Sequence, residues 1–466
     1  MSDLLLNATA KEPAVLKEAV VKELKASLRG ELLCPSDEGY DATRRVWNRM
    51  IDRRPAIIAR CAGVADIIQC VRFVREQQLL VSIRGGGHNV AGNAVCDGGL
   101  MIDLSRMKSV RVDPFARTAR AEPGMLWGEL DRETQAFGLA TPGGFVSTTG
   151  IAGLTLGGGQ SWLASKYGFT IDNLLSVDLV TADGRLLRAS TTENEDLFWA
   201  LRGAGHNFGV VTSFEYRLHP VSSVVGGMVI HPFGRNARGV LESYREFTAA
   251  LPDEVTTAAG ILTGPDGNLA VAMIACYVGA LEEAERVLAP LRRFGPPLAD
   301  TIGSIPYTTM QTMLDAAFPH GRLNYWKSSL TNQISDEVIA AVVEHGGRIP
   351  SPLSAIVIAD FHGAYSRVSK HATAYYHRDL QYDIVIASSW TEPTESERNI
   401  SWTRELFQAI ERHVPRGVYV NDLDRDEGGD RVRHAYGDNF AKLLAMKQKY
   451  DPTNLFRVNQ NIKPDG

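Results

Sequence analysis

The chain has 466 residues, 44% of them hydrophobic and 22% charged, with a formal net charge of −5 and a pI near 6.2. This composition predicts an ordinary globular protein of about two or three domains, and it excludes the strongly basic surface of a protein that binds nucleic acid or anionic membranes. The five cysteines form no Cys-x-x-Cys pair, so we expect reduced thiols in a cytoplasmic protein and neither a disulfide framework nor a metal site. No run of about eighteen apolar residues occurs, and the first residues lack the apolar core of a secretory signal, so we expect no membrane contact.

The N-terminal part, residues 1–52, is predicted to be a helical segment packed on the body of the protein. Apolar residues recur near helical spacing over residues 12–28. Residues 55–60 are predicted to form a strand, residues 65–76 a helix and residues 79–83 a second strand. This strand–helix–strand unit ends at a glycine-rich loop.

The first glycine-rich loop reads Arg84-Gly85-Gly86-Gly87-His88 and directly follows a predicted buried strand. Three consecutive glycines allow positive φ and let a ligand approach the backbone closely. Successive N–H groups in such a turn form a concavity that binds anions such as a diphosphate. A glycine turn with a solvent-facing histidine is the alternative that this loop alone leaves open.

Two further glycine-rich stretches follow. Residues 142–159 carry Ser and Thr hydroxyls between the glycines, and they are too glycine-rich for the interior of a regular helix or strand. Residues 202–209 again join a glycine loop to a predicted strand. Hairpin turns are predicted at 113–115 and 182–184 and a helix at 125–137. This mixture of strand–helix–strand units and hairpins predicts an α+β fold.

From about residue 221 the glycine runs stop, and strands alternate with longer helices. We therefore predict a second domain at 221–415, and we expect residues 416–466 to return to the first domain. The elements predicted in the second domain are a hairpin around 264–267, strands at 354–359, 372–377 and 382–388, and helices at 281–294 and 395–412.

The three glycine-rich stretches, in this order, resemble the FAD-binding domain of the vanillyl-alcohol oxidase superfamily, in its berberine-bridge-enzyme-like branch. The resemblance runs over residues 53–220 and resumes in Tyr419-Val420-Asn421, Tyr450-Asp451-Pro452 and Asn459-Gln460-Asn461-Ile462. It implies a PCMH-type FAD-binding domain of two subdomains, a substrate domain with a large antiparallel sheet covered by helices, and FAD as the cofactor.

The resemblance implies that His88 is bonded covalently to the flavin. A neutral imidazole nitrogen is a competent nucleophile, and the ordinary histidine pKa near 6.5 leaves much of it neutral at about pH 7. A histidine that only hydrogen-bonds the cofactor is the alternative. Many members of the family form a second bond from a cysteine where this chain has Val146, so a single covalent link is expected.

Other positions are assigned to the cofactor by the same resemblance, with Arg84 expected to be structural and each asparagine as well explained by a turn as by a ligand. Gln160 and His206 depart from the family pattern and leave details of the pocket open. The implied cofactor-binding residues are Arg84, Gly85, Gly86, Gly87, His88, Asn89, Gly92, Pro142, Gly143, Gly144, Thr148, Thr149, Gly150, Gly153, Gly157, Gly158, Gly159, Tyr167, Asp172, Asn173, Val210, Val211, Tyr419, Asn421, Asn459 and Asn461.

The catalytic candidates come from the second domain and the C-terminal segment. Asp360 and His362 are two residues apart near a predicted strand, so their side chains share a face. The histidine pKa suits a general base that the carboxylate orients, although a strand histidine that packs or faces solvent explains the pattern equally well. Lys327 and Asn421 are added because they lie in segments that the resemblance places near the flavin.

The resemblance implies an FAD-dependent oxidase that removes hydride from a small or medium organic alcohol, amine or phenolic compound and reduces O2 to H2O2. We expect a monomer or homodimer that binds a small-molecule substrate and O2 but no nucleic acid. A dehydrogenase with another electron acceptor and a flavin-binding protein without turnover are the alternatives. An NAD enzyme is disfavoured because no Gly-x-Gly-x-x-Gly joins a predicted strand to a helix in the required context.

Overall fold

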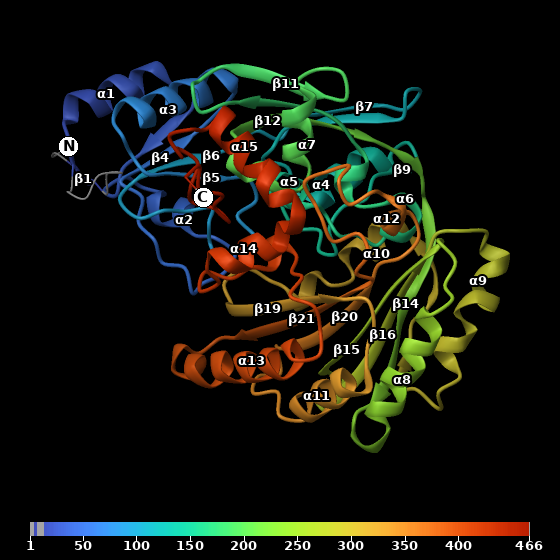
Figure 1. Ribbon diagram of the computed structural model, residues 1–466. Helices are drawn as coiled ribbons and strands as arrows, with labels where there is room; N and C mark the ends of the chain where they lie inside the picture. Colours follow the sequence, from blue (N-terminus) through green and yellow to red (C-terminus); the bar gives the residue numbers. More distant parts are fainter. Residues whose placement is uncertain (1–3, 7–13, 466) are drawn as a thin grey trace.

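The computed structural model of the protein describes residues 4–6 and 14–465 (Figure 1). It contains two smaller sheets that carry the glycine-rich loops and one large antiparallel sheet below them. The predicted α+β class and the large antiparallel sheet covered by helices are confirmed.

The first small sheet has the strand order β3-β4-β6-β5, in which β6 runs parallel to both of its neighbours. Helix α3 (Val64–Glu76) buries its apolar face on this sheet, and helix α1 (Glu18–Ser27) packs on α3. The strands are β3 (Glu31–Leu33), β4 (Ile57–Arg60), β5 (Val81–Arg84) and β6 (Leu100–Asp103), and the short helix α2 (Tyr40–Arg44) lies between β3 and β4.

The N-terminal segment is only partly helical. Strand β2 (Ala14–Leu16) pairs with β1 (Leu4–Leu6), so the helix predicted over 12–28 begins at Glu18, and residues 12 and 13 lie outside the described part.

The second small sheet is antiparallel, with the order β11-β10-β12-β8-β7. Its hairpins β7–β8 and β10–β11 confirm the predicted turns. The strands are β7 (Val110–Asp113), β8 (Thr118–Ala121), β10 (Leu174–Val180), β11 (Leu186–Ser190) and β12 (Val210–Arg217). The helices beside it are α4 (Trp127–Gln135), α5 (Ile151–Gly157), α6 (Ala164–Tyr167) and α7 (Glu195–Ala204), and β9 (Leu139–Ala140) pairs with β13 (His219–Pro220).

Helix α5 corrects the expectation that the second glycine-rich stretch holds no regular helix. Its Ile, Ala and Leu residues favour a helix between the glycines, and the helix stops where Gly158 takes a φ of +141°. The glycines therefore limit this helix to seven residues and do not prevent it.

The large sheet has the order β17-β14-β16-β15-β20-β21-β19, with β18 paired to β14. Helices α8, α11 and α13 cover its lower face in Figure 1, and the glycine-rich loops lie on the other side. The strands are β14 (Ser223–Pro232), β15 (Val255–Thr263), β16 (Leu269–Tyr277), β17 (Ala299–Asp300), β18 (Gly303–Pro306), β19 (Leu323–Thr331), β20 (Ala355–Asp360) and β21 (Tyr382–Trp390). The helices are α8 (Ala237–Thr248), α9 (Leu281–Leu288), α10 (Tyr307–Thr312), α11 (Asp336–Gly346), α12 (Ala364–Arg367) and α13 (Ser396–Glu411).

The register of the large sheet separates its two faces. Directly opposed residues of an antiparallel pair point to the same face. Ile358 opposes Ile384, and both are buried with the covering helices. Ala359 and Asp383, the next opposed pair, therefore point to the side of the glycine-rich loops, where Ala359 is buried against residues of the second small sheet.

Two predicted elements of the second domain differ from the structure. Residues 372–377 form no strand, because the Ala374 and Tyr375 amides donate to the Trp199 and Arg202 carbonyls of α7 (3.2 Å each) and not to a neighbouring strand. Tyr375 packs so closely on Gly203 that a Cβ there would lie 2.4 Å from the Tyr375 nitrogen. The helix predicted at 281–294 ends at Leu288 and continues as the 3-10 turn Ala289–Arg292, since Pro290 cannot continue an α-helix.

The C-terminal segment returns to the upper part through α14 (Gly429–Tyr436) and α15 (Phe440–Tyr450) (Figure 1). Lys447 on α15 is fully buried and forms a 2.7 Å ion pair with Asp451. Its ammonium also donates to the carbonyl oxygens of Asn207 (2.9 Å) and Phe456 (2.8 Å). The hydrogen bond to Asn207 fixes the C-terminal segment to the loop before β12, and Asp451 balances the buried charge of Lys447.

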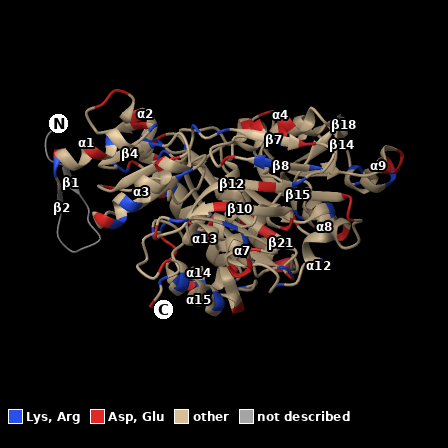
Figure 2. Cartoon of the chain, turned by 90° about the horizontal axis from the view of Figure 1, so that it is seen from above, with Lys and Arg blue, Asp and Glu red and all other residues tan. Residues whose placement is uncertain are grey.

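Charges are interspersed along the described chain, as Figure 2 shows. All five cysteines have free, buried thiols. Within residues 4–6 and 14–465, no helix is long and apolar enough to cross a membrane, and no group of His, Cys, Asp and Glu is arranged to hold a metal ion.

Replacing Lys447 with methionine is predicted to lower the free energy of unfolding by about 3–5 kcal/mol, because Asp451 would remain buried without its countercharge. Urea unfolding of the purified protein measures this change. The matched control is Lys449→Met, whose 55% exposed side chain pairs with Asp196, where a loss of roughly 0–1 kcal/mol is expected. Equal losses in the two variants would contradict the anchoring role of Lys447.

Candidate functional site

Two glycine-rich loops touch backbone to backbone at Gly86 and Gly150. A Cβ added at Gly86 would lie 2.5 Å from the Gly150 Cα, and a Cβ at Gly150 would lie 2.5 Å from the Gly86 nitrogen. Gly87 has a φ of +70°, a conformation that other residues rarely adopt. Glycine is therefore required at these positions, and the two loops form a surface of backbone atoms without side chains. This surface around Gly86, Gly87 and Gly150 is called the glycine wall below.

His88 lies at the end of this wall. Its ring stacks on Trp47 with a centroid distance of 4.5 Å and an interplanar angle of 18°, and His320 approaches at 6.2 Å. The Nε2 atom is buried and has no hydrogen-bond partner in the described part of the chain. Burial, aided by His320, lowers the pKa of His88 to about 3, so the imidazole is neutral at physiological pH.

The C-terminal segment closes the other end of the glycine loops. A Cβ at Gly157 would lie 2.1 Å from Oδ1 of Asn421, so Asn421 occupies the space of a missing side chain. The Gly159 amide donates to the Tyr419 hydroxyl (2.8 Å), and the Asn421 amide donates to the same oxygen (2.7 Å). The structure thus brings together Gly157, Gly159, Tyr419 and Asn421, as the sequence predicts.

Several buried polar atoms in these loops have no partner in the described residues. Buried polar atoms in folded proteins are normally hydrogen-bonded, so these atoms mark places where a ligand would be held. Together with the side-chain-free glycine wall, they fit a long polar ligand with an anionic linker. The atoms are His88 Nε2, Thr148 Oγ1, Asn459 Oδ1 and Asn461 Oδ1.

Three predicted cofactor residues shape the first loop instead. Arg84 donates to the backbone carbonyl of Thr43 and lies 4.0 Å from Asp103, which agrees with its expected structural role. Asn89 accepts from the Asn93 amide (3.3 Å). Gly92 has a φ of +70° and packs against Ile51.

The loop around Pro142, Gly143 and Gly144 packs inside the protein. The Pro142 carbonyl accepts from Thr170 (2.8 Å), and the Gly144 carbonyl accepts from Gln311 (2.6 Å). A Cβ at Gly143 would lie 2.7 Å from the Trp127 ring. The remaining predicted positions line the same loops or begin β12; they are Gly85, Thr149, Gly153, Gly158, Val210 and Val211.

The turn Thr170–Asp172 contacts the second glycine stretch, because the Thr170 and Ile171 amides donate to the Gly159 and Gly158 carbonyls (3.0 and 3.1 Å). The side chains of Asp172 and Asn173, however, are hydrogen-bonded to other protein groups. Both carboxylate oxygens of Asp172 accept from Arg378, at 2.7 and 2.8 Å. The Asn173 amide donates to the Tyr167 carbonyl (2.8 Å), and its oxygen lies 2.6 Å from a ring nitrogen of His219. These side chains hold loops together, and their assignment to the cofactor stays a prediction.

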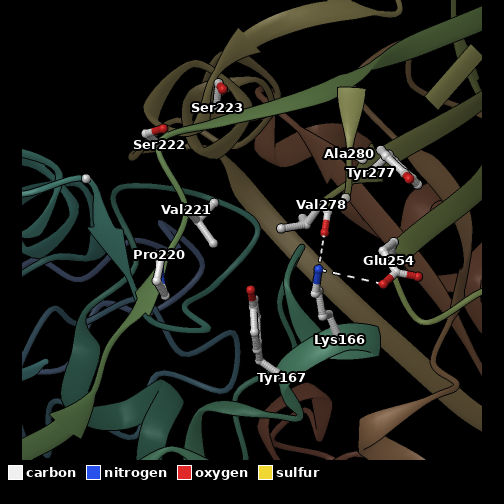
Figure 3. A pocket seen from close by; sticks show the side chains of 12 residues that line it. Lys166, Tyr167, Pro220, Val221, Ser222, Ser223, Glu254, Tyr277, Val278 and Ala280 are labelled. Carbon is white, nitrogen blue, oxygen red and sulfur yellow. Dashed lines mark hydrogen bonds and ion pairs between the residues drawn. The ribbon is translucent and has the colours of Figure 1, made fainter. Parts of the chain in front are cut away.

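Tyr167 stacks on His219 at 3.9 Å and lines an open hollow of about 540 Å³ (Figure 3). In this hollow Lys166 donates to the Val278 carbonyl (2.6 Å) and lies 3.7 Å from Glu254. The charged groups of the hollow, Lys166 and Glu254, are therefore paired with each other.

Asp383 is the acidic side chain that the large sheet turns toward the glycine loops. It is fully buried, and its Oδ2 accepts a 2.6 Å hydrogen bond from Gln160, which directly follows the Gly157–Gly159 run. Its Oδ1 has no partner in the described residues. The pKa of Asp383 is raised to about 7, because the effect of burial is larger than the opposing effect of the Gln160 hydrogen bond. A carboxyl with such a pKa suits proton transfer near neutral pH.

Sequence reasoning missed Asp383. The available signal was an acidic residue inside the apolar strand predicted at 382–388, because aspartate is almost never fully buried unless it is paired. Gln160 departs from the family pattern, and in this structure its side-chain amide donates a hydrogen bond to Asp383.

Asp360 and His362 do form the predicted pair, through Oδ2 and Nδ1. However, Asp360 opposes Tyr382, which is buried with the covering helices, so the pair lies on the face away from the glycine loops. His362 also contacts the Pro252 carbonyl (3.1 Å), just beyond α8. Burial lowers the pKa of His362, but Asp360 outweighs this and raises it above its ordinary value, which favours imidazolium over a base.

Lys327 also lies on the helix-covered face of the large sheet, away from the glycine-rich loops. It opposes Ile386, which is buried with the helices, and its ammonium pairs with Asp426 (2.6 Å) and Glu427 (3.3 Å). The prediction that Asp360, His362 and Lys327 are catalytic is therefore corrected, because strand alternation places them away from the glycine loops.

Comparison with known proteins places this site in a family. Residues 55–190 match the family described as FAD binding domain, and residues 418–463 match the family described as berberine and berberine like. The chain is 32% identical over 450 residues to an FAD-linked oxidoreductase of Dictyostelium discoideum, covering 96% of this chain and 97% of that protein. It is 33% identical over 453 residues to (R)-6-hydroxynicotine oxidase of Paenarthrobacter nicotinovorans, covering 94% and 98%.

Solved structures agree with these matches. The crystal structure of 6-hydroxy-D-nicotine oxidase from Arthrobacter nicotinovorans superposes with a TM-score of 0.85 at 30% identity, covering 94% of this chain and 98% of that one. A chitooligosaccharide oxidase superposes with a TM-score of 0.84 at 26% identity, covering 96% and 100%.

Replacing Gly86 with alanine is predicted to destabilise the protein by about 1–3 kcal/mol, because the new methyl group would meet the Gly150 backbone. The ratio of flavin to protein absorbance should fall in the same variant, since the wall would be pushed open. Gly303→Ala is the control, because nothing lies within 4 Å of a Cβ there and its φ is not positive. Wild-type stability and flavin content in Gly86→Ala would show that the loops do not need this contact.

Proposed function

The chain belongs to the FAD-linked oxidoreductases of the berberine-like family, and from this premise we propose that it is an oxidase of a small or medium organic substrate. One observation carries the proposal: Asp383, a buried carboxyl with a pKa near neutrality, shares one side of the large sheet with the glycine wall and His88. Relatives named as 6-hydroxynicotine and chitooligosaccharide oxidases favour O2 as the electron acceptor.

The residues that would hold FAD come from the two glycine-rich loops and the C-terminal segment. The amides of the Gly85–Gly87 turn would bind the diphosphate, and Thr148, Asn459 and Asn461 would satisfy other polar groups of the cofactor through their unpaired atoms. Bound FAD supplies an acceptor for a hydride from the substrate and delivers the electrons to O2 as H2O2.

His88 is proposed to carry the single covalent link to the cofactor. Its Nε2 is unpaired, and burial keeps the ring neutral, so a nitrogen lone pair is available for bonding. Trp47 fixes the plane of the imidazole by stacking on it. The second glycine loop has Val146 and no cysteine, which leaves no second attachment point there.

Asp383 is proposed to accept the proton of the substrate. Alcohols, amines and phenols all carry an O–H or N–H group whose proton must leave as the neighbouring C–H bond is broken. Gln160 orients the carboxylate by holding Oδ2, which leaves Oδ1 for the substrate. Half-exposed Trp326, Val357 and Val385 lie on the same face of the sheet and provide an apolar wall for the rest of the molecule.

Replacing His88 with alanine is predicted to release the flavin. When the wild-type protein is precipitated with acid, the yellow colour should stay in the pellet, whereas in the variant it should move to the supernatant. His320→Ala is the control, because His320 lies next to His88 and should leave the colour in the pellet. A yellow pellet from His88→Ala would place the bond on another residue.

Replacing Asp383 with asparagine is predicted to lower kcat by about 10²–10⁴-fold at unchanged flavin content, because the proton acceptor is lost. In the wild type, kcat/KM should rise as the pH rises through about 7, since only the carboxylate form accepts a proton. Steady-state assays of peroxide production across pH measure both effects. The control variant Asp360→Asn should show the same rise of kcat/KM with pH as the wild type. If Asp360→Asn lost this rise and Asp383→Asn retained it, Asp383 would not be the base.

A further inference from the structure

A second acidic residue, the half-buried Asp422, is close enough for Asp383 to act on its charge. Asp422 ends the 3-10 turn Val420–Asp422, which packs against both β19 and α5. Its Oδ2 is buried and has no partner in the described residues, and the same is true of Oδ1 of Asp383. Burial raises the pKa of Asp422, and the neighbouring Asp383 raises it further. Two carboxylates that interact in this way do not readily both ionise unless a cation joins them.

The part of the chain that the structure describes places no such cation against these two carboxyl groups. Among the described residues, no Lys or Arg side chain forms an ion pair with Asp383 or Asp422, since those of the neighbouring elements are used elsewhere. The ion pairs of these neighbours are Lys327–Asp426 (2.6 Å), Lys327–Glu427 (3.3 Å), Arg404–Asp426 (2.8 Å) and Arg431–Glu427 (3.0 Å).

Apolar side chains continue the sheet face next to the carboxyl pair. Val385 follows Asp383 on this face of β21 and opposes Val357 on β20, and both side chains are half-buried. Trp326 on β19 points to the same side and contacts Trp47, the residue that stacks on His88. A ligand at this place would therefore meet two acceptor oxygens at one end and an apolar wall along its length.

We infer that Asp383 and Asp422 together bind the ammonium group of a primary or secondary amine, whose carbon skeleton lies on Trp326, Val357 and Val385. This inference rests on the proposed oxidase function and narrows its substrate class from alcohols, amines and phenols to amines. A charge-assisted hydrogen bond to each carboxylate would satisfy both unpaired oxygens and replace the proton that the pair otherwise retains.

The reaction of such a substrate balances with the flavin of the proposed function as hydride acceptor and with one water molecule. The ammonium R–CH2–NH3⁺ gives one N–H proton to the carboxylate of Asp383, and the adjacent carbon loses one hydride to the flavin of the proposed function. The product is the iminium ion R–CH=NH2⁺, which water converts to an aldehyde and ammonium. Asp422 keeps its negative charge and stabilises the cation before and after this step.

A binding experiment on the flavin-loaded protein tests the inference without turnover. Cumylamine and cumyl alcohol have the same shape, and neither carries a hydrogen on the carbon that would lose hydride. Their dissociation constants are measured at about pH 7 by calorimetry and by the change in flavin absorbance. We expect cumylamine to bind at least about tenfold more tightly than cumyl alcohol, because charge-assisted hydrogen bonds are stronger than neutral ones.

The variant Asp422→Asn should weaken cumylamine binding by about tenfold and leave cumyl alcohol within about twofold of the wild type, since only the charge is removed. Asp266→Asn, the same change at the exposed turn between β15 and β16, is the matched control and should alter neither constant. The unmodified absorbance spectrum of the flavin shows that each variant is folded and loaded.

Equal binding of the amine and the alcohol by the wild type would overturn the inference, as would an amine preference that survives in Asp422→Asn. The proposed function fails by a different result, namely that no alcohol, amine or phenol of a broad panel bleaches the bound flavin. Bleaching by alcohols with no preference for cumylamine would therefore leave the oxidase function standing and reject only the amine.

Discussion

The antiparallel register between β20 and β21 decides which side chains of the large sheet can meet the cofactor. Asp383 opposes Ala359 and points to the glycine-rich loops, whereas Asp360 opposes Tyr382 and points to the helices. A shift of one residue would exchange these faces. The isoleucines of both strands prevent such a shift, because they are buried under the helices and would otherwise be turned away from them.

The position of the acid relative to the cofactor loops is fixed by contacts that cross the molecule. Gln160 follows the glycine run and hydrogen-bonds Asp383 on the sheet, which links the loops and the sheet through one buried side chain. A buried carboxyl without partners would be costly, so this bond also makes the burial of Asp383 tolerable. The C-terminal segment adds Tyr419 and Asn421 to the same place and is tied to the loop before β12 by the hydrogen bond from Lys447 to the Asn207 carbonyl.

The cofactor loops could be predicted from the sequence because glycine acts locally. The positive φ of Gly87 and the hairpin around Gly184 follow from rules that involve only neighbouring residues or the shape of glycine. The fold class was predicted for the same reason, since the mixture of hairpins and strand–helix–strand units is visible along the chain. His88 and Asn421 were named from a family pattern, and the structure places both at the ends of the glycine wall.

The face of the large sheet that carries the proposed base could not be predicted in this way, because it depends on the pairing of strands that are separated in the sequence. Period-two alternation places Asp360 and His362 on a common face, but it does not say which of the two faces meets the cofactor. The strand predicted at 372–377 failed for a related reason, since the local pattern does not reveal that Tyr375 packs against Gly203. Asp383 was visible only as an acid in an apolar strand, and the role proposed for it depends on the Gln160 hydrogen bond and the strand register.

The most direct test is a crystal structure of the protein with its flavin. We predict that the isoalloxazine ring lies between His88 and Asn421, with one face turned to Trp326 and Asp383. Electron density for the ring on the helix-covered side of the sheet, beside Asp360 and His362, would contradict this placement.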